Sequence, residues 1–118
     1  MNTLVIGNQT AEERRAAIVG AWESGKAESA ARFNFESVEA AWELLNAKRW
    51  AILKIMAGQG PLSIREIARR VGRDVRGVHS DVRLLYLSGV IDKTAEGKMV
   101  FPYDVIRLEF TLDTRRAA

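Results

Sequence analysis

Apolar residues between positions 62 and 91 recur at helical spacing in two short blocks that a glycine separates. The apolar positions of the first block are Ile64, Ile67, Ala68 and Val71. Ser63, just before this block, and Glu66, in its first turn, match an S-x-x-E capping box. In this motif the side chain of each residue accepts a hydrogen bond from the backbone amide of the other. Gly72 ends the block, because glycine enters the left-handed conformation without a Cβ penalty. The pattern predicts a short helix capped by Ser63 and terminated at Gly72.

The second block predicts a helix with one apolar and one cationic side. Asp74 is a good N-cap residue for it. Its apolar side is expected to hold Val75, Val78, Val82, Leu85 and Tyr86. The opposite side is expected to hold Arg76, Gly77, Ser80 and Arg83. Two helices joined by a short glycine-containing turn are typical of a helix-turn-helix, whose second helix enters the DNA major groove.

Two short β-prone segments follow these helices. Ser88-Gly89 ends the second helix, and strands are predicted at Val90–Ile91 and Met99–Phe101, on either side of a polar turn. Such a hairpin directly after a recognition helix is typical of a wing. Lys93 and Lys98 stand at its base, from where they can reach a phosphate or the minor groove. A further, half-buried strand is predicted over Val105–Leu112.

The N-terminal part of the chain predicts a strand and helices. A strand is expected at Thr3–Ile6, then a helix from Ala11 to Ser24 capped by Thr10 or Asn8, and then a loop over residues 25–32. The strand has no partner hairpin nearby, and an unpaired strand edge is a template for another chain. We therefore expect residues 1–45 to form an extension for dimerisation or partner binding. The alternative is that its helices cover the back of the DNA-binding region within one chain.

Two further helices are predicted before the helix-turn-helix. Asn34 is expected to cap a helix that continues through Leu45, and Asn46 a helix over Ala47–Ala57. The inward-facing candidates are Val38, Ala41, Trp42, Leu45, Trp50, Ile52, Leu53 and Met56. The helical spacing of Trp22, Trp42 and Trp50 favours a core or interface role over nucleotide stacking. The predicted class is α+β, mainly α: a winged helix-turn-helix over residues 46–113 with an N-terminal strand and helix extension.

Composition and charge narrow the functional class. A chain of 118 residues predicts one domain. The absence of cysteine excludes disulfides and thiolate chemistry. The net charge is only +3, but residues 62–80 hold five arginines and two acids. Such a basic segment is the footprint of a phosphate-backbone binder, although an isolated charge run is usually only a solvated helix face.

Motifs for other functions are missing from the sequence. The full phosphate-binding motif G-x-x-x-x-G-K-[ST] and zinc-ligand spacings do not occur, so we expect no enzyme activity, no cofactor and no metal. No apolar run approaches the ~18 residues of a membrane span, and no secretory signal opens the chain. These features predict a cytoplasmic protein that does not bind membranes.

Ten residues are candidate DNA contacts: Ser63, Arg65, Arg73, Arg76, Gly77, His79, Ser80, Arg83, Lys93 and Lys98. Arg76 and Arg83 are two helical turns apart, so both can project into the groove and pair with guanine. Ser63 and Arg73 lie at helix N-termini, where phosphates bind favourably. Arg65 is expected to contact the backbone or only water, and His79 to contact a phosphate or pack at the flank of the helix. Gly77 would let the helix backbone approach the groove.

These motifs carry a family resemblance. KRWAIL at 48–53, GPLSIREIARRVGRDVRGVHSDVRLL at 60–85, SGVI at 88–91 and FPYD at 101–104 resemble a group of small winged helix-turn-helix regulators related to the MarR-like and ArsR-like proteins. The resemblance covers residues 47–110. It implies a homodimer on a palindromic operator. Members of this group also resemble antitoxins that repress their own operon, which implies a cognate toxin as a possible partner.

The sequence therefore predicts a sequence-specific regulator of double-stranded DNA, acting as a homodimeric repressor. The alternative is a winged-helix module for protein interaction, in which the basic side binds an acidic protein and DNA is not read.

Overall fold

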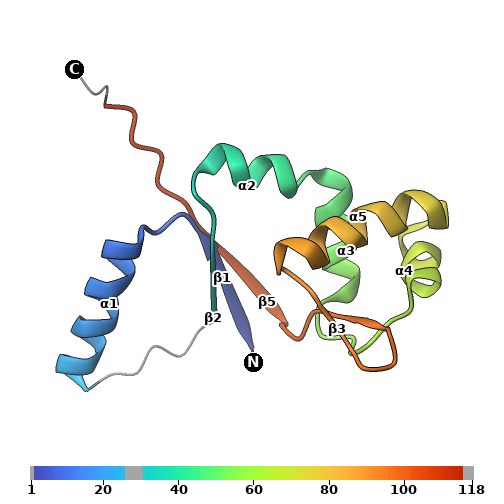
Figure 1. The fold of residues 1–118 in the computed structure, drawn as a ribbon, viewed down its shortest axis with the longest axis horizontal. Coiled ribbons are helices and arrows are strands. Elements are labelled where there is room, and N and C mark those ends of the chain that lie inside the picture. The colour runs from blue at the N-terminus through green and yellow to red at the C-terminus, as the bar shows by residue number, and fades with distance from the viewer. Residues whose placement is uncertain (1, 26–30, 116–118) are drawn as a thin grey trace.

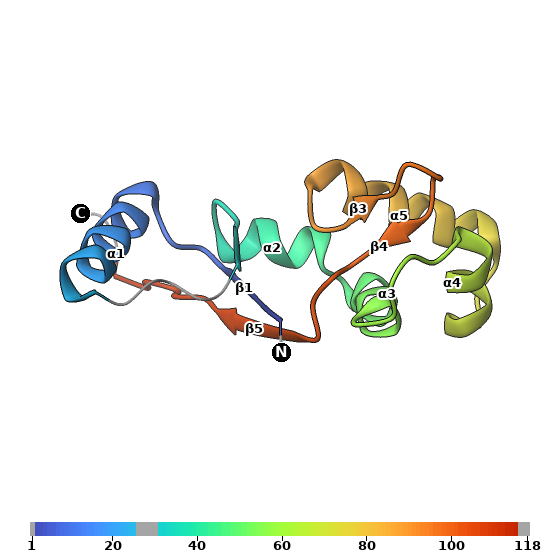
Figure 2. The ribbon, with the colours of Figure 1, turned by 90° about the horizontal axis from the view of Figure 1, so that it is seen from below.

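The computed structural model describes residues 2–25 and 31–115, which form an α+β arrangement (Figure 1). The elements in chain order are β1 (Thr3–Gly7), α1 (Ala11–Ser24), β2 (Ala31–Asn34), α2 (Val38–Leu44), α3 (Ala47–Met56), α4 (Ile64–Val71), α5 (Val75–Ser88), β3 (Asp92–Lys93), β4 (Met99–Val100) and β5 (Val105–Glu109). The molecule is flat, with principal extents of 45 × 39 × 20 Å. Figure 2 shows α1 and α4 at opposite ends, with α2 and α3 between them.

The N-terminal strand is the centre of a parallel sheet with the order β2-β1-β5. Leu4 of β1 is in register with Ala31 of β2 and with Ile106 of β5. The strand has no partner hairpin nearby, as expected, but the inference that its edge is unpaired is wrong. Its partners are not a neighbouring hairpin: one follows a crossover helix, and the other comes from near the C-terminus. The strand therefore offers no free edge to a second molecule.

The segment before α2 also differs from the prediction. Part of the expected loop over residues 25–32 is strand β2, while residues 26–30 lie outside the described part of the chain. Asn34 is not a helix cap, because it is in extended backbone opposite Gly7. Instead Ser37 caps α2, and its Oγ accepts a hydrogen bond of 3.1 Å from the Ala40 amide.

Helix α1 has the predicted bounds but covers no core. Thr10 and Glu13 form a reciprocal capping box at its start, and Gly25 ends it in the left-handed conformation. None of its residues is buried, and the side chain of Trp22 is 86% exposed. Trp42 on α2 is also more than half exposed, and Trp50 on α3 is partly buried. The first two tryptophans are therefore not core residues.

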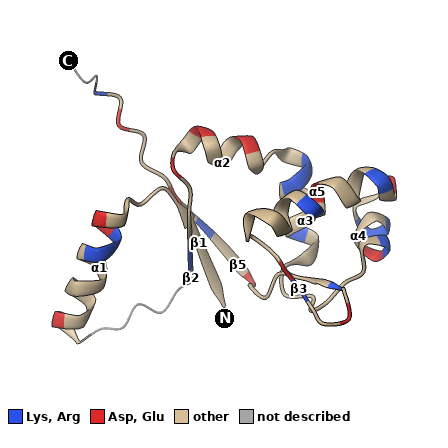
Figure 3. Ribbon diagram, viewed as in Figure 1, with Lys and Arg blue, Asp and Glu red and all other residues tan. Residues whose placement is uncertain are grey.

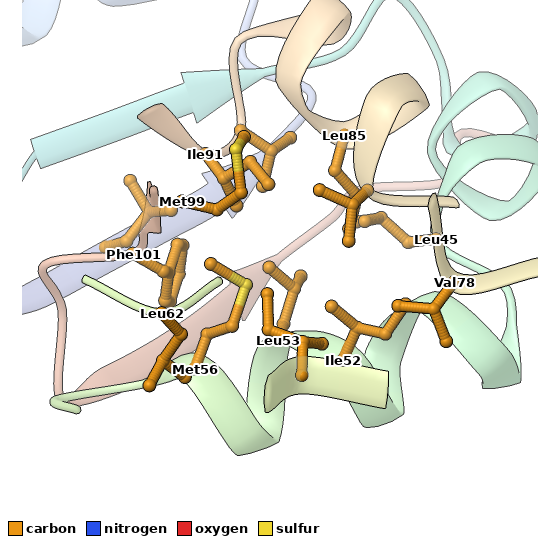
Figure 4. Packing of buried hydrophobic residues seen from close by; sticks show 14 of the residues in the cluster. Leu45, Ile52, Leu53, Met56, Leu62, Val78, Leu85, Ile91, Met99 and Phe101 are labelled. Carbon is orange, nitrogen blue, oxygen red and sulfur yellow. The ribbon is translucent and has the colours of Figure 1, made fainter. Parts of the chain in front are cut away.

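Helices α3, α4 and α5 share one apolar core with β1 and the β3–β4 hairpin (Figure 4). Its fully buried side chains include Ile6, Ile52, Leu53, Met56, Ile67, Val78, Val82, Leu85, Ile91, Met99 and Phe101. Burial of a side chain of this size stabilises the fold by roughly 1.5–3 kcal/mol. Leu62 and Met99 exchange two backbone hydrogen bonds of 2.8 Å, which tie the hairpin to the start of α4. Strand β1 therefore shares one apolar core with the helices and the hairpin, through Leu4 and Ile6.

The caps predicted around α3 and α4 are confirmed. Asn46 caps α3, Ser63 caps α4, and Gly72 ends α4 with φ of 72°. The first hairpin strand begins at Asp92 rather than Val90, since Val90 and Ile91 are buried in the core before pairing starts, and the second ends at Val100 rather than Phe101. The predicted final strand ends at Glu109 instead of Leu112.

The buried side of α5 is partly as predicted. Val78, Val82 and Leu85 are buried, whereas Val75 and Tyr86, which were also predicted on the apolar side, are 43% and 39% exposed. The reason is helical phase. The buried stripe of α5 is centred on Val78, Asp81, Val82 and Leu85, so Val75 and Tyr86 lie at the edge of this stripe. Asp74 occupies the N-cap position but makes no side-chain cap bond.

In the two described ranges, no helix is long and apolar enough to cross a membrane.

Candidate nucleic-acid interface

The solvent side of α5 presents two arginines and a serine. Arg76, Ser80 and Arg83 are all exposed, while Val78 and Val82 face the core. The predicted phase of this cationic side is therefore confirmed. The Ser80 hydroxyl donates a 3.4 Å hydrogen bond to the Arg76 carbonyl, so it rests on its own helix.

The hairpin and the start of α4 lie beside this side of α5. A pocket of about 180 Å³ is lined by residues of all three, including Ile64, His79, Arg83, Lys93 and Gly97. The Lys93 Nζ stands 4.8 Å from the centre of the Tyr86 ring, a cation–π contact that holds the amine against α5. The structure thus brings together His79, Arg83 and Lys93, three of the predicted contact residues.

Lys98 lies at the other end of the hairpin turn and is exposed. Its backbone amide donates to the Thr94 Oγ1 over 3.1 Å, and the Thr94 amide donates to the Lys98 carbonyl over 2.7 Å. These bonds fix the backbone of the turn, so the lysine amine extends from a defined position.

Helix α4 offers less free positive charge than its sequence suggests. The Glu66 carboxylate binds the guanidinium of Arg69 and that of Arg70, the second over 2.6 Å from Nε. These hydrogen bonds lower the pKa of Glu66 from 4.5 to about 2. The predicted capping box is therefore half formed. The Ser63 Oγ accepts a hydrogen bond from the Glu66 amide over 3.1 Å, but the Glu66 carboxylate binds the two arginines and not the Ser63 amide. Arg65 is exposed on the same helix.

Arg73, a predicted phosphate contact, is held inside the protein. Its Nη2 donates to Asp81 Oδ2 over 2.8 Å, and the Nε of Arg49 donates to Asp81 Oδ1 over 3.0 Å. The Asp81 side chain is only 11% exposed. Arg49 continues to α2 through its Nη1, which donates to the carbonyls of Glu43 and Leu44. We call Arg49, Asp81 and Arg73 the ion triad.

Asp81 is not among the residues predicted for the site, although the sequence contains a signal for it. Asp81 follows Val78 by three residues and precedes Leu85 by four, which places an acid in the apolar stripe of α5. Acidic side chains are almost never fully buried unless a cation pairs with them. An acid in this stripe therefore predicts a buried partner, but the sequence does not say which arginine it is.

Gly77 lies against the ion triad. A Cβ added to Gly77 would stand 3.2 Å from Arg73 Nη2. The missing side chain thus makes room for the Arg73 guanidinium, an explanation that differs from the predicted approach of the backbone to a groove.

The exposed charge on this part of the surface is mixed but mainly positive. Figure 3 shows lysine and arginine on α4 and α5, at the end of the molecule away from α1, and acidic residues on α2. The exposed basic candidates are Arg65, Arg76, Arg83, Lys93 and Lys98. Asp74, Asp92 and Glu96 are exposed acids of the same region. The net positive charge of this end therefore comes from the arginines of α4 and α5, because Asp92 and Glu96 lie on the same hairpin as Lys93 and Lys98.

Comparison with known proteins gives a family match for this region. The model of the family HVO_A0114 matches residues 44–108, from the last residue of α2 into β5. No curated protein and no solved structure matches the chain.

Proposed function

The chain belongs to the HVO_A0114 family, and we propose that it is a sequence-specific double-stranded DNA-binding regulator that represses as a homodimer. The observation that carries this proposal is the pair Arg76 and Arg83, which project from one exposed side of α5 beside a lysine-bearing hairpin.

The order of elements from α3 to β4 supports a winged helix-turn-helix. Helix α4, a turn through Gly72, helix α5 and the β3–β4 hairpin follow one another, and α3 packs beneath α4 and α5. In this arrangement α5 is the recognition helix and the hairpin is the wing. The backbone bonds between Leu62 and Met99 join the wing to the entrance of α4, so helix and wing keep a fixed relation.

DNA recognition then divides between α5 and the wing. An arginine guanidinium in the major groove can donate two hydrogen bonds to O6 and N7 of guanine. Lysines contact phosphates as point charges, which adds affinity without sequence information. Occupancy of a promoter by this module would block transcription without any catalytic step.

Loss of either recognition arginine should relax specificity. We expect Arg76→Ala and Arg83→Ala each to weaken operator binding by ~1–3 kcal/mol and to relax the preference at different base positions. Lys98→Ala is the matched control, since it should weaken all sequences alike and lower the salt slope by about one. Gel shifts with the DNA upstream of its own gene, against a scrambled duplex and over a series of salt concentrations, measure both effects.

The same gel shifts test the alternative reading. If the wild-type protein does not distinguish the upstream DNA from the scrambled duplex at moderate salt, the regulator proposal fails. A module that binds an acidic protein through the same basic residues would then be the better explanation.

Helix α1 supports the homodimer. Its exposed apolar side chains include Ile18, Val19 and Trp22. A helix of about 14 residues is marginal in water without tertiary contacts, so α1 gains most from packing against another chain. A palindromic operator requires a second copy, because two-fold symmetry sets the spacing of the half-sites.

Removal of the Trp22 side chain should weaken this dimer. We expect Trp22→Ser to raise the dimer dissociation constant about 30-fold or more, since a buried interface tryptophan is typically worth ≥ ~2 kcal/mol. Glu23→Ser, the adjacent exposed position, is the control and should leave the constant unchanged. Light scattering over a dilution series measures both; a Trp22→Ser dimer of undiminished stability would place the interface elsewhere.

A further inference from the structure

The ion triad has a composition that the proposed function does not explain. Asp81 lies on the recognition helix, Arg73 in the turn before it, and Arg49 on α3. The side chains of Arg49 and Arg73 are 15% and 24% exposed. Two arginines therefore share one carboxylate and are largely withdrawn from solvent, in a protein for which cations are the means of binding DNA.

We infer that Asp81 is a specificity-determining residue: it withholds Arg73 from the DNA backbone and fixes the rotation of α5 that points Arg76 and Arg83 outward. This inference rests on the proposed DNA-binding function and extends it to a residue on the opposite side of the helix from the bases.

The contacts of Asp81 fix the helix from two directions. Its Oδ1 accepts a hydrogen bond from the Arg49 Nε. The same guanidinium donates from Nη1 to the Leu44 carbonyl over 3.0 Å. Its Oδ2 accepts a hydrogen bond from the Nη2 of Arg73, which lies in the turn between α4 and α5. The carboxylate therefore joins α5 to α3, to the end of α2 and to the turn, and a rotation of α5 about its axis would break these bonds. Apolar contacts such as those of Val78 and Val82 tolerate small rotations, because they have no directional preference.

The residues around Arg73 hold its guanidinium in the protein, beside Asp81. Gly77 lies one helical turn before Asp81, and any Cβ there would come within 3.2 Å of Arg73 Nη2. The other terminal nitrogen, Nη1, is buried and has no hydrogen-bond partner in the described part of the chain. A guanidinium placed to contact phosphates would keep its nitrogens in solvent. Its burial indicates a structural position that also keeps one positive charge off the DNA-binding surface.

Neutralising Asp81 should therefore have two opposite effects on DNA binding. In Asp81→Asn, Arg73 loses its anion and becomes available to phosphates. We expect the magnitude of the salt slope to increase by about one, the value for one added phosphate contact. The preference for the upstream DNA over a scrambled duplex should fall by roughly 5- to 150-fold, the range for loss of one bidentate base contact. Simple destabilisation of the fold would not increase the salt slope.

Arg73→Met separates retention from direct contact. Because Arg73 is held by Asp81 in the wild type, this variant should leave the salt slope unchanged. The double variant Asp81→Asn/Arg73→Met should return the increased slope to the wild-type value. Asp81→Glu, which keeps the charge, should recover more of the sequence preference than Asp81→Asn.

Gel shifts of the four variants and the wild type, over a salt series and on both duplexes, decide the question, with circular dichroism to verify folding. A decrease of the salt slope by about one in Arg73→Met alone would show that Arg73 contacts phosphate in the wild type and would overturn the inference. So would an Asp81→Asn variant with unchanged slope and preference. If Asp81→Asn does not fold, Arg73→Met still tests the claim by itself. A wild-type protein that binds neither duplex would overturn the proposed function as well, whereas specific wild-type binding with a DNA-contacting Arg73 overturns the inference alone.

Discussion

Replacing Val82 by aspartate should abolish the cooperative melting of the protein, together with the DNA binding that we propose for it. Val82 lies on the buried stripe of α5 in one core cluster with Leu53 and Ile67, and its side chain is almost fully buried. An aspartate there would be an unpaired charge in an apolar environment, among the few changes that destabilise by more than ~4 kcal/mol. A domain of this size is stable by only about 5–15 kcal/mol, so a loss above ~4 kcal/mol removes a large part of that stability and, at the lower end of the range, nearly all of it.

Leu84→Asp is the matched control for this prediction. Leu84 lies two residues further along α5 and is 43% exposed, so the same charge would stay in water. Urea denaturation followed by circular dichroism should show a near-normal transition for Leu84→Asp and none for Val82→Asp. A Val82→Asp protein that melts like the wild type would mean that α5 has a different phase, and the assignment of Arg76 and Arg83 to the solvent side would fall with it.

The features that the sequence predicted correctly are those that local contacts determine. Ser63, Gly72 and Asn46 act on the helix ends next to them, through one hydrogen bond or one backbone conformation. The outward direction of Arg76 and Arg83 follows from helical spacing alone. These parts of the candidate interface could therefore be derived without knowledge of the remaining chain.

The errors concern contacts between distant segments. Nothing in the sequence around β1 indicates that its partners are β2 and β5, because parallel strands need long connections and leave no turn signal. The same lack of long-range information left the ion pair of Arg73 unpredicted. Local sequence places Arg73 at a helix N-terminus, but its partner Asp81 was not singled out as buried, and Arg49 approaches from another helix.

Asn34 shows a different limit. Asparagine before an apolar helical pattern is a good cap, and the assignment of Asn34 depended only on that local preference. The Phe35 amide donates to the Gly7 carbonyl over 2.8 Å, which keeps the chain extended past Asn34. Tertiary pairing therefore delayed the helix by several residues, to Val38.

The position of β1 gives the second large expected effect, on Ile6. Ile6 is fully buried and belongs to the same core cluster as Leu53 and Phe101, although it lies in the N-terminal strand. Truncation of a buried isoleucine to alanine removes its contacts and leaves a cavity, at a cost of 2–5 kcal/mol in comparable cores, so we expect Ile6→Ala to lose about that much stability. Because the sheet and the helices share this core, the whole molecule should melt earlier, including α4 and α5.

Leu108→Ala is the control, since Leu108 is in register with Ile6 on β5 but is 48% exposed. Its truncation removes a smaller buried surface and should cost well under half as much as Ile6→Ala, by the ~25 cal/mol per Å² scale of apolar burial. Differential scanning calorimetry should record one transition for the wild type and one, at lower temperature, for Ile6→Ala. Two separate transitions, with the helical one unmoved by Ile6→Ala, would show that residues 47–101 fold without the sheet. A single shifted transition would instead mean that the folding of α4 and α5 depends on the N-terminal strand β1.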